Sequence, residues 1–279
     1  MLKQIYANLN HLFKNKIFYT EIILTAILSA FIVFANYSPE IQATEKRLYL
    51  DDVFFTMYQL MGFILAAGIS LIVGTEYSDG TIRNKLIVGV TRIQVYFSHL
   101  IASAFVPSCL VLIVHGIVTY GLGYFLFGNF QMPVTEVIIA LLCALMASIV
   151  FSALFVAIAL NCSNKAITAV ASLLLILGLT FLSASLGNAL AEPEMSYDGI
   201  TISLEGGVQL GDLIQNPAYV TGIERTIYEV VYDLFPTGQL IQVYENDFSR
   251  YARWPVFSGA LLALITVAGF LTFRKRDIK

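Results

Sequence analysis

Long apolar runs separated by short polar links dominate the chain. These runs cover residues 17–35, 53–74, 93–127, 134–160, 166–187 and 254–273. A helix needs about 20 mostly apolar residues to cross the hydrocarbon core of a bilayer, which is about 30 Å thick. The pattern therefore predicts an all-α polytopic membrane protein with six transmembrane helices, forming a single transmembrane domain over residues 1–279.

The third run is longer than a bilayer requires. Residues 93–127 contain no Asp, Glu, Lys or Arg, and a continuous helix of this length would measure about 50 Å. We therefore expect its first turns to lie at the interface or in water. Pro107 predicts a kink within it.

Two polar segments have patterns of their own. Residues 1–16 carry apolar side chains at near-helical spacing, which fits either an amphipathic helix on the membrane surface or a solvated helix start. Residues 188–253 are the only large hydrophilic segment. Within it, residues 200–210 predict a small β-hairpin around a glycine turn. Residues 221–234 predict a helix that Pro236 and Gly238 end, either a re-entrant element or a surface helix.

Composition and charge agree with a membrane protein and orient it. The chain is 58% hydrophobic and 13% charged, whereas soluble domains carry about 25% charged residues. With six spans, 11 of the 16 basic residues fall on the side of the two termini. Loops rich in Lys and Arg stay on the cytoplasmic side of a membrane. We therefore expect a multi-pass protein of the cell membrane. Its termini (1–16, 274–279) and its 75–92 block would be cytoplasmic, and its 188–253 segment would be external. The basic residues on the inner side are Lys3, Lys14, Lys16, Arg83, Lys85, Arg92, Lys165, Arg274, Lys275, Arg276 and Lys279.

The 75–92 block predicts a short amphipathic helix between the second and third spans. Thr81 is a candidate cap for its start, Gly89 a candidate stop, and Thr91 a candidate cap for the next span. Glu76 and Asp79 precede the helix at its positive dipole end, where pairing with Arg83 is possible. We expect an apolar stripe of Ile82, Leu86 and Ile87 and a polar stripe of Arg83, Asn84 and Lys85. An ordinary loop made basic by topology is the alternative explanation.

The residues from Glu76 to Leu86, with Gly89, Thr91-Arg92 and Tyr96, resemble the motif of permease subunits of ABC-2 type transporters. The resemblance is specific over about 25 residues, and the six-span layout is similar as well. His99 departs from the pattern, since relatives often carry Lys there.

The resemblance implies that residues 75–92 form a coupling helix that docks on a cytosolic ATPase. It also implies a dimer of permease subunits, identical or paralogous, working as an exporter, with ATP and Mg bound by the ATPase and no cofactor bound by this chain. Arg83, Lys85 and Arg92 would contact the ATPase or anionic lipid headgroups, and Glu76 would brace the helix internally. The coupling residues assigned in this way are Glu76, Tyr77, Gly80, Thr81, Ile82, Arg83, Asn84, Lys85, Gly89 and Arg92.

Two polar side chains inside apolar runs are further candidates. Intramembrane polar groups often mark transport pathways, so Glu21 and His115 are possible translocation-path residues. The structural alternatives are that Glu21 snorkels or pairs with Lys14 or Lys16, and that His115 is a hydrogen-bonded packing residue.

Other chemistries lack sequence support. The chain has no phosphate-binding G-x-x-x-x-G-K-[ST] motif, so we expect it not to hydrolyse ATP. It has no metal-ligand spacing of His or Cys and no basic stretch interleaved with aromatics for nucleic acid. We predict no catalytic residues and no metal site. A secondary transporter or an intramembrane enzyme remains the alternative, but Glu21 and His115 fall on different spans.

Overall fold

The computed structural model describes residues 1–44, 48–162, 164–198, 200–202 and 208–276. Six helical segments in these residues are long and apolar enough to cross a membrane, which confirms the predicted all-α, six-span fold. The segments are Lys16–Asn36, Leu50–Ser78, Arg92–Phe127, Val134–Asn161, Lys165–Ala191 and Tyr251–Lys275.

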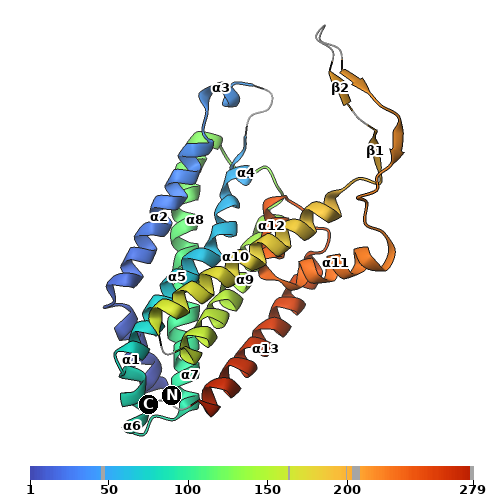
Figure 1. Cartoon of the computed structure of the whole chain (residues 1–279). Coiled ribbons are helices and arrows are strands. Elements are labelled where there is room, and N and C mark those ends of the chain that lie inside the picture. Colours follow the sequence, from blue (N-terminus) through green and yellow to red (C-terminus); the bar gives the residue numbers. More distant parts are fainter. Residues whose placement is uncertain (45–47, 163, 199, 203–207, 277–279) are drawn as a thin grey trace.

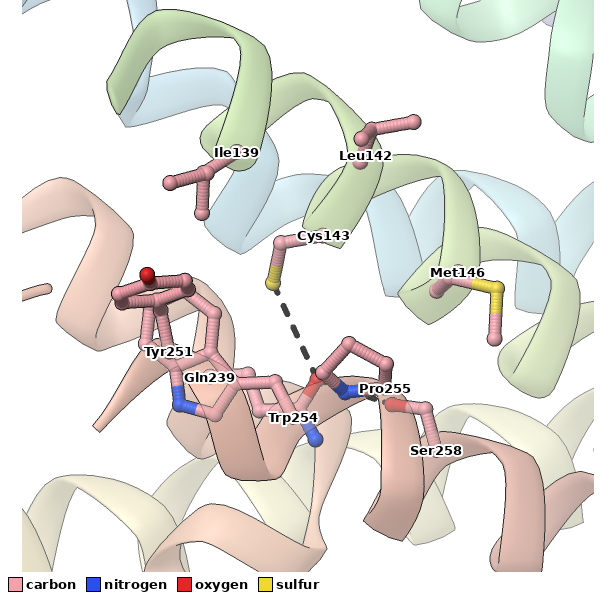
Figure 2. A pocket seen from close by; sticks show the side chains of 9 residues that line it. All are labelled: Ile139, Leu142, Cys143, Met146, Gln239, Tyr251, Trp254, Pro255 and Ser258. Atoms are coloured by element: carbon pink, nitrogen blue, oxygen red, sulfur yellow. Dashed lines mark hydrogen bonds between the residues drawn. The ribbon is translucent and has the colours of Figure 1, made fainter. Parts of the chain in front are cut away.

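Both termini lie at the same end of the helical bundle (Figure 1). We call this the terminal end; it carries α1 (Leu2–Leu12), α6 (Thr81–Ile87) and α7 (Arg92–His99). The opposite, or far, end carries α3 (Pro39–Gln42), the strands and α11 (Gly222–Leu234). The remaining long helices connect the two ends: α2 (Lys16–Asn36), α5 (Thr56–Ser78), α8 (Val106–Phe127), α9 (Val134–Asn161), α10 (Lys165–Ala191) and α13 (Trp254–Lys275).

Helix α5 lies at the centre of the bundle and packs against α2, α9 and α10. Small residues let these helices approach closely, as is common between membrane helices. A Cβ at Gly62 would lie 2.6 Å from Ile176 of α10. The Ser70 hydroxyl donates to Ser172 of α10 at 2.8 Å, which ties the same pair of helices together in apolar surroundings.

The long third span is divided into three parts. Helix α7 is followed by π-helical residues Leu100–Phe105 (η1), and α8 begins immediately afterwards with Pro107 in its first turn. Proline lacks the amide needed for the α-helical ladder, and π-helical turns are a known way to accommodate such an interruption. The irregularity predicted for this span therefore lies in the six residues before Val106.

The far end contains the predicted hairpin and more. β2 (Ile200–Ile202) pairs with β3 (Val208–Leu210), and the arm is extended by β1 (Met195–Tyr197) pairing with β4 (Leu213–Gln215), both antiparallel. The predicted glycine turn, 205–207, lies outside the described residues. Helix α11 starts one residue after Thr221, as expected.

Helix α11 ends at Leu234, just before Pro236 and Gly238, as predicted, but a second helix that was not predicted follows. The chain turns at Phe235, and Pro236 begins a second helix, α12 (Pro236–Tyr244), because proline fits the first turn of a helix. Gly238 permits the tight turn, since a Cβ there would lie 2.1 Å from the carbonyl oxygen of Tyr232. Helix α12 is buried against α5, α9 and α10. The sequence left open a re-entrant element or a surface helix, and the chain contains one of each kind. Helix α12 inserts into the bundle, and α11 keeps an exposed apolar face.

An ion-pair cluster holds this far-end turn together. Asp233 of α11 is fully buried, and Arg250 Nε lies 3.1 Å from its carboxylate. Gln242 of α12 donates to the same carboxylate at 3.1 Å, and Arg253 lies 3.5 Å from it. The cluster joins α11, α12 and the start of the last span.

Candidate functional site: a capped helix between the second and third spans

Helix α6 lies between two glycines with left-handed backbones. Gly80 has φ +70° and follows the end of α5. Gly89 has φ +91° and follows the end of α6. No atom lies within 4 Å of a Cβ built at either position, so the need for glycine is conformational and not steric. The prediction that Thr81 caps the helix is wrong: Gly80 occupies the N-cap position without a side-chain hydrogen bond, and Thr81 is the first helical residue.

The end of α6 and the start of α7 are as predicted. The Gly89 amide donates to Leu86 and the Val90 amide to Lys85, at 3.1 and 3.0 Å. This pair of bonds is the Schellman arrangement, which satisfies the last helical carbonyls. Thr91 then caps α7 in a reciprocal box with Gln94, whose side chain bonds back to the Thr91 amide. Few backbone groups are left free to change conformation.

A buried carboxylate connects α5 to the inner face of α6. Glu76 is 2% exposed, and Lys85 Nζ lies 2.6 Å from its Oε2. Lys85 also donates to the side chain of Asn8 in α1, at 2.9 Å. The expected pairing of Glu76 with Arg83 is therefore not found, because Lys85, three residues after the buried Ile82, shares its inward face while Arg83 points outward. We call Glu76, Lys85, Asn8, His11 and His99 the Glu76 cluster.

The N-terminal helix completes this cluster. His11 Nδ1 lies 3.1 Å from Glu76 Oε1, and this hydrogen bond raises the pKa of His11 above its usual 6.5. Asn8 is 2% exposed and donates to Ser98 of α7 at 3.0 Å. Helix α1 therefore packs against α7 and η1, and its polar side chains bind the block between spans 2 and 3.

The last span is joined to the same block. Arg92 donates to the carbonyl oxygens of Phe273, at 2.9 Å, and Arg276 at the end of α13. Cations at a helix C-terminus satisfy its free carbonyls and its negative dipole end. The Arg276 guanidinium in turn lies 5.1 Å from the ring centre of Tyr77, a cation–π distance.

The outer face of α6 has a different character. Arg83 and Asn84 are exposed, and Ile87 and Val88 are 70% and 79% exposed. The predicted apolar stripe is therefore wrong at Ile87: five residues after Ile82, it lies about 140° around the helix from the buried face, by helical geometry. A depression of ≈ 600 Å³ runs along this surface. Its lining residues are Arg83, Leu86, Ile87, Gly89, Val90, Thr91 and Arg92.

His115 is fully hydrogen-bonded inside the bundle. Its Nε2 lies 3.0 Å from the Phe54 carbonyl and so carries the proton. Its Nδ1 lies 3.0 Å from the hydroxyls of both Ser29 and Thr119, either of which can donate to its lone pair. These contacts are those of a packing histidine.

Glu21 lies elsewhere and in a different environment. It is 4% exposed in α2, and neither carboxylate oxygen has a hydrogen-bond partner among the described residues. The expected snorkelling or pairing with Lys14 or Lys16 is therefore wrong: the side chain turns inward, toward Gly68 of α5. Glu21 and His115 do not form a pair.

A comparison with protein families identifies the chain. The model of the ABC-2 family transporter proteins matches residues 8–184, nearly two thirds of the sequence. The chain belongs to this family. No curated protein matches it. The family match includes the Glu76 cluster and α6, and it confirms the resemblance seen in residues 76–96.

Sequence reasoning missed much of what holds this ABC-2 family site together. Asn8, His11 and Ser98 are polar residues in segments that gave no functional signal. His99 is fully buried, and its Nε2 lies 3.5 Å from Glu76 Oε2, so the departure from Lys at this position bears directly on the cluster. The sequence does contain one feature that could have predicted these contacts. His99 and Asn8 lie on apolar helix faces, where a buried polar residue needs a hydrogen-bond partner.

Proposed function

We propose that this chain is the membrane-spanning permease subunit of an ATP-driven exporter, and that the outer face of α6 docks on a separate cytosolic ATPase. In this proposal the terminal end is cytoplasmic and the far end external, in the cell membrane. Two such chains form the translocation pathway, and two ATPase subunits bind ATP and Mg. The single observation that carries the docking assignment is the division of α6 into a buried ionic face and an exposed face with apolar tips.

The inner face supports the proposal because a docking element must transmit movement. Glu76 and Lys85 join α6 to α5, Asn8 joins it to α1, and Arg92 joins the start of α7 to α13. Displacement of α6 by a partner would therefore be passed to three spans at once, namely α5, the span that begins with α7, and α13. Such packed elements shift as rigid units rather than deforming continuously.

The outer face supports it because its chemistry is that of an interface. Exposed Arg83 and Ile87 line an open depression, and the next residue, Val88, is exposed as well. Arginine is enriched at protein interfaces, and the buried centre of an interface is more apolar than the rest of the surface. The sequence expectation that Lys85 and Arg92 contact the ATPase is revised in the proposal, since both are engaged within the chain and Arg83 is left as the outward cation.

The test is co-purification of the solubilised chain with a candidate ATPase from an adjacent gene. We expect the variant combining Arg83→Glu and Val88→Asp to retain its gel-filtration profile and lose most of the bound ATPase. Ile223→Asp is the matched control, since Ile223 is 81% exposed at the far end. Equal recovery of ATPase with the wild type and the α6 variant would refute the docking assignment.

A further inference from the structure

The buried carboxyl group of Glu21 is not used by the proposed coupling site. It lies in α2, one to two turns from Lys16, and faces α5. Its two oxygens have no hydrogen-bond partner, and no described basic side chain lies within ion-pair distance. A charged carboxylate without a partner costs several kcal/mol in such an environment, so burial here favours the neutral acid.

The surrounding helices leave room for this carboxyl. A Cβ at Gly68 would lie 2.3 to 2.5 Å from the Glu21 carboxyl atoms, so any other residue there would displace the carboxyl group from this position. A cavity of ≈ 190 Å³ adjoins the group between α2 and α5. Its other lining residues are apolar except for Thr20, and none titrates: Ile17, Thr20, Leu24, Ile64, Ala67 and Leu71.

The cavity opens on the side of the bundle. Leu24 and Thr20 are exposed on the α2 side, whereas Ile64 and Gly68 form the buried wall. The Thr20 hydroxyl already donates to the Lys16 carbonyl at 3.0 Å, so it does not compete for Glu21. A ligand entering from the bilayer would meet apolar walls and one acid at the end.

This combination selects the chemical class of the ligand. Ca²⁺ and Mg²⁺ take six or more ligands, mostly oxygen, and Zn²⁺ takes about four, mostly His and Cys, so a single carboxyl among apolar residues fits none of them. A primary ammonium group carries three N–H donors, which satisfy both carboxylate oxygens, and an alkyl chain fits the apolar walls. We propose that the Glu21 cavity binds a lipophilic primary amine in its ammonium form. The amine enters as the free base and takes the Glu21 proton, so that the bound pair is an ammonium group and a carboxylate.

The first measurement uses dicyclohexylcarbodiimide, which labels neutral carboxyl groups in apolar sites, on the full-length solubilised chain without ATPase. We expect mass spectrometry to find the label on Glu21, and saturating hexylammonium to slow labelling about tenfold by occupying the site. Hexanol lacks the charge and hexyltrimethylammonium lacks the N–H donors, so we expect neither to protect.

Two variants test the cavity itself. Ala67→Leu narrows the cavity while keeping the acid, and we expect slower labelling that hexylammonium does not reduce further. Glu21→Gln should lose the label, and Glu40→Gln, which removes an exposed acid at the far end, should behave as wild type. Labelling of Glu21 that hexylammonium leaves unchanged, protection that persists in Ala67→Leu, or absence of label on wild-type Glu21 would each overturn the proposal. Because no ATPase is present, failure here leaves the docking assignment standing.

Discussion

Glu76 in α5 and Glu21 in α2 are both buried carboxyl groups, yet their surroundings are opposite. Glu76 has Lys85 at 2.6 Å and His11 at 3.1 Å, whereas Glu21 has no partner among the described residues and an adjoining cavity. A buried carboxyl group stays charged where a cation pairs with it. Without a partner, it is neutral until a cation binds. The difference separates an acid that fixes structure from an acid suited to a ligand.

The largest expected effect comes from removing the cation beside Glu76. Lys85→Met leaves a carboxylate that is 2% exposed without its nearest partner, and we expect a loss of about 3 kcal/mol in the free energy of unfolding. Denaturation in mild detergent measures it. Lys3→Met, at an exposed position, is the control and should change little. A loss equal to that of the control would remove the structural role assigned to Glu76.

Replacing Gly89, the glycine after α6, tests whether the turn beside the Glu76 cluster fixes the position of α6. Gly89→Ala places a side chain at φ +91°, and we expect a cost of about 1 kcal/mol for the left-handed backbone. Gly116→Ala is the matched control in a helix with open space around the Cβ; it should be neutral or stabilising. If both alanines have the same effect, the Schellman turn does not constrain α6.

The His11 contact predicts a smaller and pH-dependent effect. Its folded pKa is raised above 6.5 by Glu76, so the stabilisation is fully present below about pH 6.5. It is lost as pH rises through the folded value. We expect the difference in melting temperature between wild type and His11→Gln to shrink from pH 5.5 to 8.5. Since His11 is half exposed, the difference should correspond to less than about 1 kcal/mol. A difference that grows with pH contradicts the assignment.

The smallest expected effect is at the other carboxyl. Glu21→Gln replaces a neutral acid by a neutral amide of similar shape, and we expect unfolding to change by less than about 0.5 kcal/mol. The same denaturation experiment used for Lys85→Met gives a direct comparison. A loss above about 2 kcal/mol would mean that Glu21 is ionised and paired.

Hydropathy predicted the six spans because each needs only length and apolar composition, and Gly89 and Thr91 were predictable because capping is local. Contacts between residues far apart in the sequence were not predictable. The contact of Asn8 with Ser98 spans 90 residues, and it depends on how α1 packs, which periodicity does not determine. Rotation around a seven-residue helix likewise decided that Lys85 points inward and Ile87 outward. Glu21 was misread because its distance from Lys14 and Lys16 in sequence suggested pairing, whereas Gly68 offers space on the opposite side.

The most direct test of the coupling account is site-specific photo-crosslinking in membranes that contain the proposed ATPase partner. A photoreactive side chain at Val88, which is 79% exposed on the outer face of α6, is compared with one at Ile223, 81% exposed at the far end. The account predicts an ATPase adduct from Val88 and none from Ile223. Absence of an adduct at Val88, with the ATPase shown to be present and active, or adducts of equal yield from both sites, would contradict it.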